Sequence, residues 1–158
     1  MSLRLRLSCD VPAPPAAVWE VLVDWVGQRR WIPLTTVRVV SDQASGIGVR
    51  CDALSGWWLG RFPAGLLDRF IVTAWQPPTG AEPGLLEVLH LGPYFTGPGA
   101  FELRPTAQGT EVRCTEIVEV SGGRLLTKLA SPLTPVLRTG FRHSLRSLGR
   151  LSVQNQLR

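Results

Sequence analysis

From Leu34 to Val120 the chain alternates apolar and polar residues with a period of two, and this pattern limits the fold more than any other feature. A period of two places successive side chains on opposite faces of a strand. Short runs of turn residues divide the stretch, and short connections join strands as antiparallel neighbours. The breaks are expected at 45–48, 63–65, 77–80, 92–99 and 107–109, and the strands at 34–41, 48–57, 66–75, 85–91, 99–105 and 110–120.

The N-terminal residues add one strand and two short helices. Leucines alternate with arginines over residues 3–8, which predicts a seventh, half-buried strand. Prolines follow, and a helix can begin at Pro14 or Pro15 because proline is tolerated in a first helical turn. Its apolar stripe has helical spacing, and a second short helix is expected over 28–30. The stripe consists of Val18, Val21, Leu22 and Trp25, and Trp19, Trp25 and Trp31 are expected in the core.

After the predicted sheet, residues 124–155 are predicted to be helical, with a break or kink at Pro132 and Pro135 and a new start at Thr134. The helix has an apolar stripe, formed by Leu137, Phe141, Leu145 and Leu148, and an arginine edge, formed by Arg138, Arg142, Arg146 and Arg150. A curved sheet needs a cover for its concave face. One helix about 10 Å wide cannot fill the concavity of so many strands, so we expect a cavity between sheet and helix.

The 158 residues suit a single domain spanning 1–158, and an apolar content of 44% excludes a disordered chain. The three cysteines, Cys9, Cys51 and Cys114, are too far apart in sequence for a metal site and odd in number. They are expected to be reduced, buried thiols, and neither a metal nor a cofactor is expected. We find no signal-peptide pattern and no apolar run of about 18 residues, so a cytoplasmic location is expected.

Charge is divided unevenly along the chain. The net charge is +5, yet residues 1–120 hold 10 arginines and 12 acidic residues, while residues 121–158 hold six arginines, one lysine and no acidic residue. A basic segment of this kind is typical of contact with an anionic membrane or an acidic partner, or simply of a solvated helix face. Aromatic residues do not interleave the arginines, and no recognised module is present, so nucleic acid is not an expected partner. The oligomeric state stays open.

A series of short motifs runs through the chain in a fixed order: residues 11–14 and 18–24, Trp31-Ile32-Pro33, and residues 46–48, 74–78, 99–103 and 109–116, followed by the long helix. This series resembles the START-like (SRPBCC) superfamily, in particular its bacterial polyketide cyclase/dehydrase and lipid-transport group. The resemblance implies an α+β, helix-grip (birch-pollen-allergen-like) fold. In that fold a seven-stranded curved antiparallel sheet wraps a long C-terminal helix, and two short helices follow the first strand. It also implies binding of a lipid, a polyketide or another hydrophobic molecule.

Two residues are candidates for catalysis. Glu116 shares a strand face with apolar neighbours, and burial there would favour its protonated form and suit it to general acid or base work. It can equally pair with an arginine or lie at an open strand end. His90 lies in the strand at 85–91 and can face either the cavity or solvent. The same question applies to Glu87 and His143.

The candidates for ligand binding are apolar residues near strand ends, in loops or on the face toward the cavity: Trp57, Trp75, Tyr94, Phe95, Cys114 and Phe141. Aromatic side chains offer large apolar area with a polar edge, which suits ring-shaped ligands. Simple core packing is the alternative for Trp57 and Trp75. A separate set of charged residues is expected to form ion pairs on the solvent face: Arg50, Asp52, Asp68 and Arg69.

Three functions fit these observations. The first is a carrier or sensor that encloses a hydrophobic small molecule. The second is a cyclase, aromatase or dehydratase in which Glu116 or His90 moves protons. The third is a module that binds an acidic partner through its basic helix. Motifs for phosphate loops, dinucleotide binding, zinc peptidases and serine hydrolases do not occur in the sequence.

Overall fold

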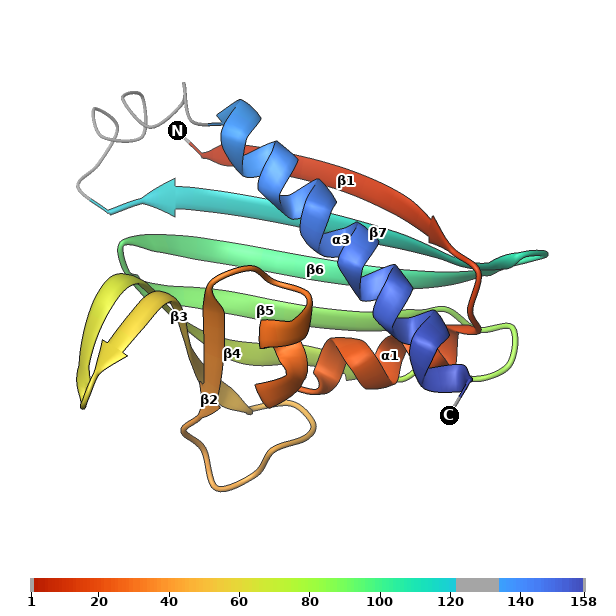
Figure 1. The fold of residues 1–158 in the computed structure, drawn as a ribbon, viewed down its shortest axis with the longest axis horizontal. Helices are drawn as coiled ribbons and strands as arrows, with labels where there is room; N and C mark the ends of the chain where they lie inside the picture. The colour runs from red at the N-terminus through yellow and green to blue at the C-terminus, as the bar shows by residue number, and fades with distance from the viewer. Residues whose placement is uncertain (1, 122–133, 158) are drawn as a thin grey trace.

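A computed structural model describes residues 2–121 and 134–157, and Figure 1 shows a sheet crossed by a long C-terminal helix. Its elements in chain order are β1 (Leu3–Val11), α1 (Pro15–Val23), the 3-10 helix η1 (Val26–Arg30), β2 (Thr35–Val39), β3 (Arg50–Leu59), β4 (Phe62–Gln76), β5 (Gly84–Pro93), β6 (Phe95–Thr106), β7 (Gly109–Val120) and α3 (Thr134–Gln156). The α+β class, the seven strands and the two short helices after β1 are confirmed.

Every neighbouring pair of strands is antiparallel, and the spatial order is β1-β7-β6-β5-β4-β3-β2. Strands β2 to β7 therefore follow one another as hairpins, as short connections require. The first strand pairs with the last, so that Leu5 lies opposite Glu116. The first and last strands in the sequence, β1 and β7, are therefore neighbours at one edge of the sheet.

The core lies between the concave face of the sheet, α1 and the C-terminal half of α3. Figure 1 shows α3 crossing the sheet diagonally, with its C-terminal end beside α1 and its N-terminal end over β1 and β7. Leu145, Leu148 and Leu151 on α3 are buried, and Gly149 approaches Val11 so closely that a Cβ there would lie 3.0 Å from it. The prediction that Trp19, Trp25 and Trp31 lie in the core is confirmed.

Two predicted breaks in the sheet are wrong. Residues 63–65 lie inside β4, and the β3–β4 turn falls instead at Gly60 and Arg61, where Gly60 adopts a φ of +65° that favours glycine. Residues 97–99, expected in a loop, lie inside β6. The predicted kink at Pro132 and the helical assignment of residues 124–133 lie outside the described residues.

In the described part of the chain, no helix combines the length and the apolar character needed to cross a lipid bilayer.

Candidate acid–base site

Three ionisable side chains from three strands meet on the concave face of the sheet. The Nδ1 atom of His90, on β5, lies 2.9 Å from both carboxylate oxygens of Asp68, on β4. The Nε2 atom of the same ring lies 3.1 Å from Oε2 of Glu116, on β7. We call Asp68, His90 and Glu116 the acid–base cluster. One imidazole thus links two carboxylates from opposite sides of the ring.

His90 and Glu116 reach each other because strand β6, which lies between their strands, carries glycines at that level. His90 lies opposite Gly97, and Glu116 lies opposite Gly99. A Cβ built on Gly99 would lie 2.5 Å from Oε2 of Glu116, so the carboxylate occupies the space that a side chain would take. These two glycines form a floor over which the cluster extends from β5 to β7.

The cluster is largely shielded from water and lies among aromatic rings. The exposed side-chain fractions are 18% for Asp68, 11% for His90 and 8% for Glu116. The rings of Phe95 and Phe70 have their centres 5.3 Å and 6.3 Å from that of His90. A ligand on this face would therefore contact apolar side chains that surround one set of polar side chains, the acid–base cluster.

The charge state of His90 follows from its partners. Burial lowers the pKa of His90, but the hydrogen bonds and negative charges of Asp68 and Glu116 outweigh it and raise the pKa to about 9. At neutral pH the ring is an imidazolium that donates one N–H to each carboxylate. It then has no lone pair free for a metal, and no group of three or more His, Cys, Asp or Glu side chains among the described residues is arranged to hold a metal ion.

The cluster extends to a thiol on β7. The Sγ atom of Cys114 lies 3.9 Å from Oε1 of Glu116 and donates a weak hydrogen bond to it. Burial and the nearby carboxylate raise the pKa of Cys114 well above its usual value, so the thiol stays protonated. Cys114 therefore contacts Glu116 as a neutral thiol. Burial likewise raises the pKa of Cys9 to about 11 and that of Cys51 to about 12, and all three cysteines are free.

The expectation that Asp68 forms an ion pair on the solvent face is wrong. Asp68 alternates with Phe70 and Val72, which are both buried, so its side chain lies on the concave face as theirs do. A shift in register between β4 and β5 falls between Asp68 and Phe70. The alternation was a visible signal for this placement. The expected ion pair between Arg69 and Asp52 is present, with Nε 3.8 Å from Oδ1.

The structure brings together four of the residues that the sequence singled out, namely His90, Glu116, Phe95 and Cys114. The other four lie elsewhere. Trp75 packs edge-on against Trp19 in the core, with ring centres 5.2 Å apart, and Phe141 packs against the same core from α3. Trp57 is 65% exposed on the β3–β4 hairpin, and Tyr94 is 49% exposed between β5 and β6.

The remaining acid–base candidates, Glu87 and His143, are exposed. Their alternative interpretation as surface residues therefore holds. They are useful as matched controls, because each offers the same functional group outside the cluster.

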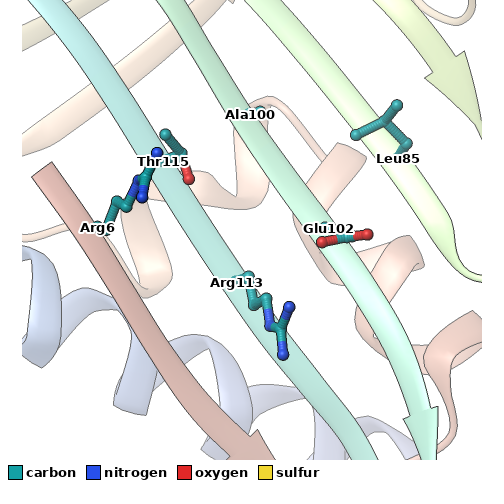
Figure 2. Close-up of a pocket in the computed structure, with 6 residues that line it drawn as sticks. All are labelled: Arg6, Leu85, Ala100, Glu102, Arg113 and Thr115. Carbon is teal, nitrogen blue, oxygen red and sulfur yellow. The ribbon is translucent and has the colours of Figure 1, made fainter. Parts of the chain in front are cut away.

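Two hollows among the described residues lie away from the cluster. One, of about 450 Å³, lies on the face of the sheet turned from the helices. Figure 2 shows the residues that line it: Arg6, Leu85, Ala100, Glu102, Arg113 and Thr115. The other, of about 540 Å³, is a groove between the end of β1 and the C-terminal half of α3. The predicted cavity between sheet and helix also involves residues 124–133, which are outside the described part of the chain.

Comparisons with known proteins support the fold. No protein-family model matches the chain, and no curated protein matches it. Among solved structures, the Zhui aromatase/cyclase from Streptomyces sp. R1128 is 15% identical with a TM-score of 0.73, covering 100% of this chain and 97% of that one. Ara h 8.0201 is 11% identical with a TM-score of 0.69, covering 98% and 99%. A Thalictrum norcoclaurine synthase is 12% identical with a TM-score of 0.64, covering 99% and 97%. The chain has a helix-grip fold.

Proposed function

We propose that this helix-grip protein binds an apolar carbonyl compound between the concave face of its sheet and α3, and that the acid–base cluster moves protons on it. The observation that carries the proposal is His90, held between Asp68 and Glu116 among aromatic rings. The rest of this face is apolar. Buried ionisable groups with shifted pKa values are concentrated at functional sites of proteins, so the cluster marks a candidate site.

The cluster contains an acid and a base within hydrogen-bond distance of each other. The Glu116 carboxylate is the least exposed of the three groups and can accept a proton from a ligand on the apolar face. The His90 imidazolium can donate its Nε2 proton to a ligand oxygen. Asp68 remains bonded to Nδ1, where its negative charge stabilises the imidazolium and fixes the ring orientation.

This pairing suits a cyclisation that ends with loss of water. In the dehydration step, the Glu116 carboxylate takes a proton from the carbon beside a carbonyl, and the electron pair of the broken C–H bond forms the new double bond as the hydroxyl on the neighbouring carbon leaves. The His90 imidazolium protonates the hydroxyl that leaves as water. The proton on Glu116 then passes to neutral His90 across the 3.1 Å contact, which restores both groups. The aromatase/cyclase with the same fold is consistent with this class of reaction, although its likeness concerns the fold.

A carrier or sensor is the second candidate, and one observation favours it. Each member of the cluster is hydrogen-bonded to another member. Such a satisfied network can anchor the polar end of a hydrophobic molecule without moving a proton. The two candidates therefore share the ligand class and differ in whether a proton is exchanged.

Proton exchange on a simple ketone separates the two candidates. We would incubate the protein with α-tetralone, a bicyclic aryl ketone, in deuterated buffer and follow loss of the α-proton signal by NMR. The wild type is expected to accelerate exchange. Glu116→Gln and His90→Gln are expected to lower the rate by about 10²-fold or more, the usual contribution of a positioned acid or base.

Two substitutions at exposed sites, Glu87→Gln and His143→Gln, are the matched controls and should leave the rate unchanged. Binding of α-tetralone, seen as shifts of amide signals on β5 to β7, with no acceleration of exchange would favour the carrier. Absence of both binding and exchange, tested also with fatty acid and polyphenol probes, would overturn the proposal of a hydrophobic ligand.

A further inference from the structure

The β3–β4 hairpin exposes large apolar side chains. Trp57 is 65% exposed, and Leu59 and Phe62 are each 66% exposed. Leu59 lies opposite Phe62, and Trp57 lies opposite Ala64, so the three large side chains share one face of the hairpin. Figure 1 shows the hairpin, drawn in yellow, projecting from the left end of the sheet. Three large apolar residues gathered on one protruding face are more than the scattered exposure that any surface has.

The charge around these residues has one sign. No acidic residue occurs from 53 to 67, and Arg61 occupies the turn with its guanidinium carbon 5.5 Å from the centre of the Phe62 ring. The cation therefore lies at the very tip, beside an aromatic ring that is open to solvent. Apolar side chains and a cation are presented together.

The N-terminal end of α3, which lies over β1 at the top of Figure 1, repeats this combination. Val136 is 69% exposed and Leu137 is 48% exposed, and the neighbouring Arg138 and Arg142 are exposed as well. Residues 121–158 contain no acidic residue to balance these cations. Each of the two segments thus exposes both apolar and basic side chains.

We propose that the hairpin tip and the start of α3 form a docking face for the surface of an anionic lipid bilayer. We define the docking face as Trp57, Leu59, Arg61, Phe62, Val136, Leu137 and Arg138. Tryptophan and phenylalanine favour the boundary between headgroups and acyl chains, while arginines are attracted to anionic headgroups. Charge complementarity favours lipid, because the face offers only positive charge and its apolar part protrudes instead of forming a pocket.

This inference stands independently of the acid–base cluster, since no residue is shared between the two. It also extends the membrane contact expected from the arginine edge, because it adds an apolar anchor that the arginines alone do not supply. Basic residues give salt-dependent attraction, and stable attachment needs a second, apolar signal.

Co-sedimentation with vesicles tests the docking face. Phosphatidylcholine vesicles with and without phosphatidylserine would be mixed with the purified protein at low and high salt. We expect binding to the anionic vesicles that weakens at high salt. The substitution of Trp57, Leu59 and Phe62 together by serine should lower the apparent affinity about tenfold or more, and Arg61→Ala with Arg138→Ala should have a similar effect.

Leu89 and Leu91 provide the matched control, because they are exposed leucines on β5 outside the docking face. Their substitution by serine should leave vesicle binding unchanged, and far-ultraviolet circular dichroism should show that every variant is folded. The proposal would be overturned by absence of binding to anionic vesicles or by equal binding of the hairpin variant. It would also be overturned by a hairpin-dependent dimer that does not bind vesicles.

Discussion

The two halves of α3 differ in how they meet the sheet. In the C-terminal half, Leu145, Leu148, Leu151 and Ser152 are buried against β1 and α1. In the N-terminal half, every residue from 135 to 140 is exposed. Two residues of β1 locate these halves. Cys9 donates a weak hydrogen bond, 3.7 Å long, to the backbone carbonyl of Leu145 in the middle of α3. Leu5, nearer the N-terminal end of α3, lies opposite Glu116 of the acid–base cluster.

This difference divides the concave face into a filled end and an end that carries the cluster. At the filled end, leucines of α3 remove apolar surface from water and stabilise the fold. At the other end, residues 135–140 of α3 are exposed. There the side chains of Asp68, His90 and Glu116 on the sheet contact one another. One helix therefore packs tightly against the sheet along its C-terminal half, while residues 135–140 of its N-terminal half are exposed.

The largest effect on stability should come from the filled end. Leu148 is fully buried, and Leu148→Ala removes its packing and leaves a cavity, so the free energy of unfolding should fall by about 3 kcal/mol. Denaturant unfolding followed by tryptophan fluorescence measures this change. A loss below about 1 kcal/mol would show that α3 is not packed as described.

The acid–base cluster predicts that stability depends on alkaline pH. The pKa of His90 is about 9 in the folded protein and 6.5 in the absence of its partners, so the folded state holds the proton more tightly. The stabilisation is complete below pH 6.5 and is lost as the pH rises through 9, and it amounts to about 3 kcal/mol. Unfolding free energies measured between pH 6 and 8.5 should therefore decrease, and this range ends below the pH at which the three buried thiols would ionise in the unfolded chain.

His90→Gln is the control for this pH dependence. The variant lacks the titrating group, so its unfolding free energy should stay nearly level over the same range, although it starts lower because two carboxylates lose their cation. The same decline in variant and wild type would assign the pH dependence to other groups. NMR titration of the imidazole signals would then locate His90 directly.

Alternation within strands was enough to place single residues but not to assemble the cluster. It placed Glu116 on an apolar face, and the residue is 6% exposed there. It left the orientation of His90 open, because its partners are 22 and 26 residues away and are reached only through the register of three strand pairs. Register depends on bulges such as the shift near Asp68, which no local pattern specifies.

Glycine explains the other failures of sequence-based prediction. Residues 97–99 have the composition of a turn, yet in β6 Gly99 makes room for the Glu116 carboxylate and Gly97 for the backbone carbonyl of Ile117 on β7. Residues 63–65 also resemble a turn, but Gly65 lies directly opposite Gly56 within the hairpin, where neither position has space for a Cβ. A glycine in a sheet marks a close approach as readily as a turn, and only the paired strand distinguishes the two.

Gly99→Ala tests the glycine floor with no change to any ionisable residue. The added methyl group would displace the Glu116 carboxylate from His90, since a Cβ at this position would lie only 2.5 Å from Oε2. We expect the free energy of unfolding to fall by about 1–2 kcal/mol and the pKa of His90 to move down toward 6.5. Gly140→Ala, in open space on α3, is the control and should stabilise the helix slightly.

The smallest effect is expected at the other end of α3, where Leu137→Ala should change the free energy of unfolding by less than about 0.5 kcal/mol. Leu137 is 48% exposed, so its truncation removes little packing, in contrast to the same truncation at Leu148. The two variants are matched in chemistry and differ only in the half of the helix that they probe. Denaturant unfolding under identical conditions compares them directly. A loss at Leu137 as large as that at Leu148 would mean that the N-terminal half also packs against the sheet in solution.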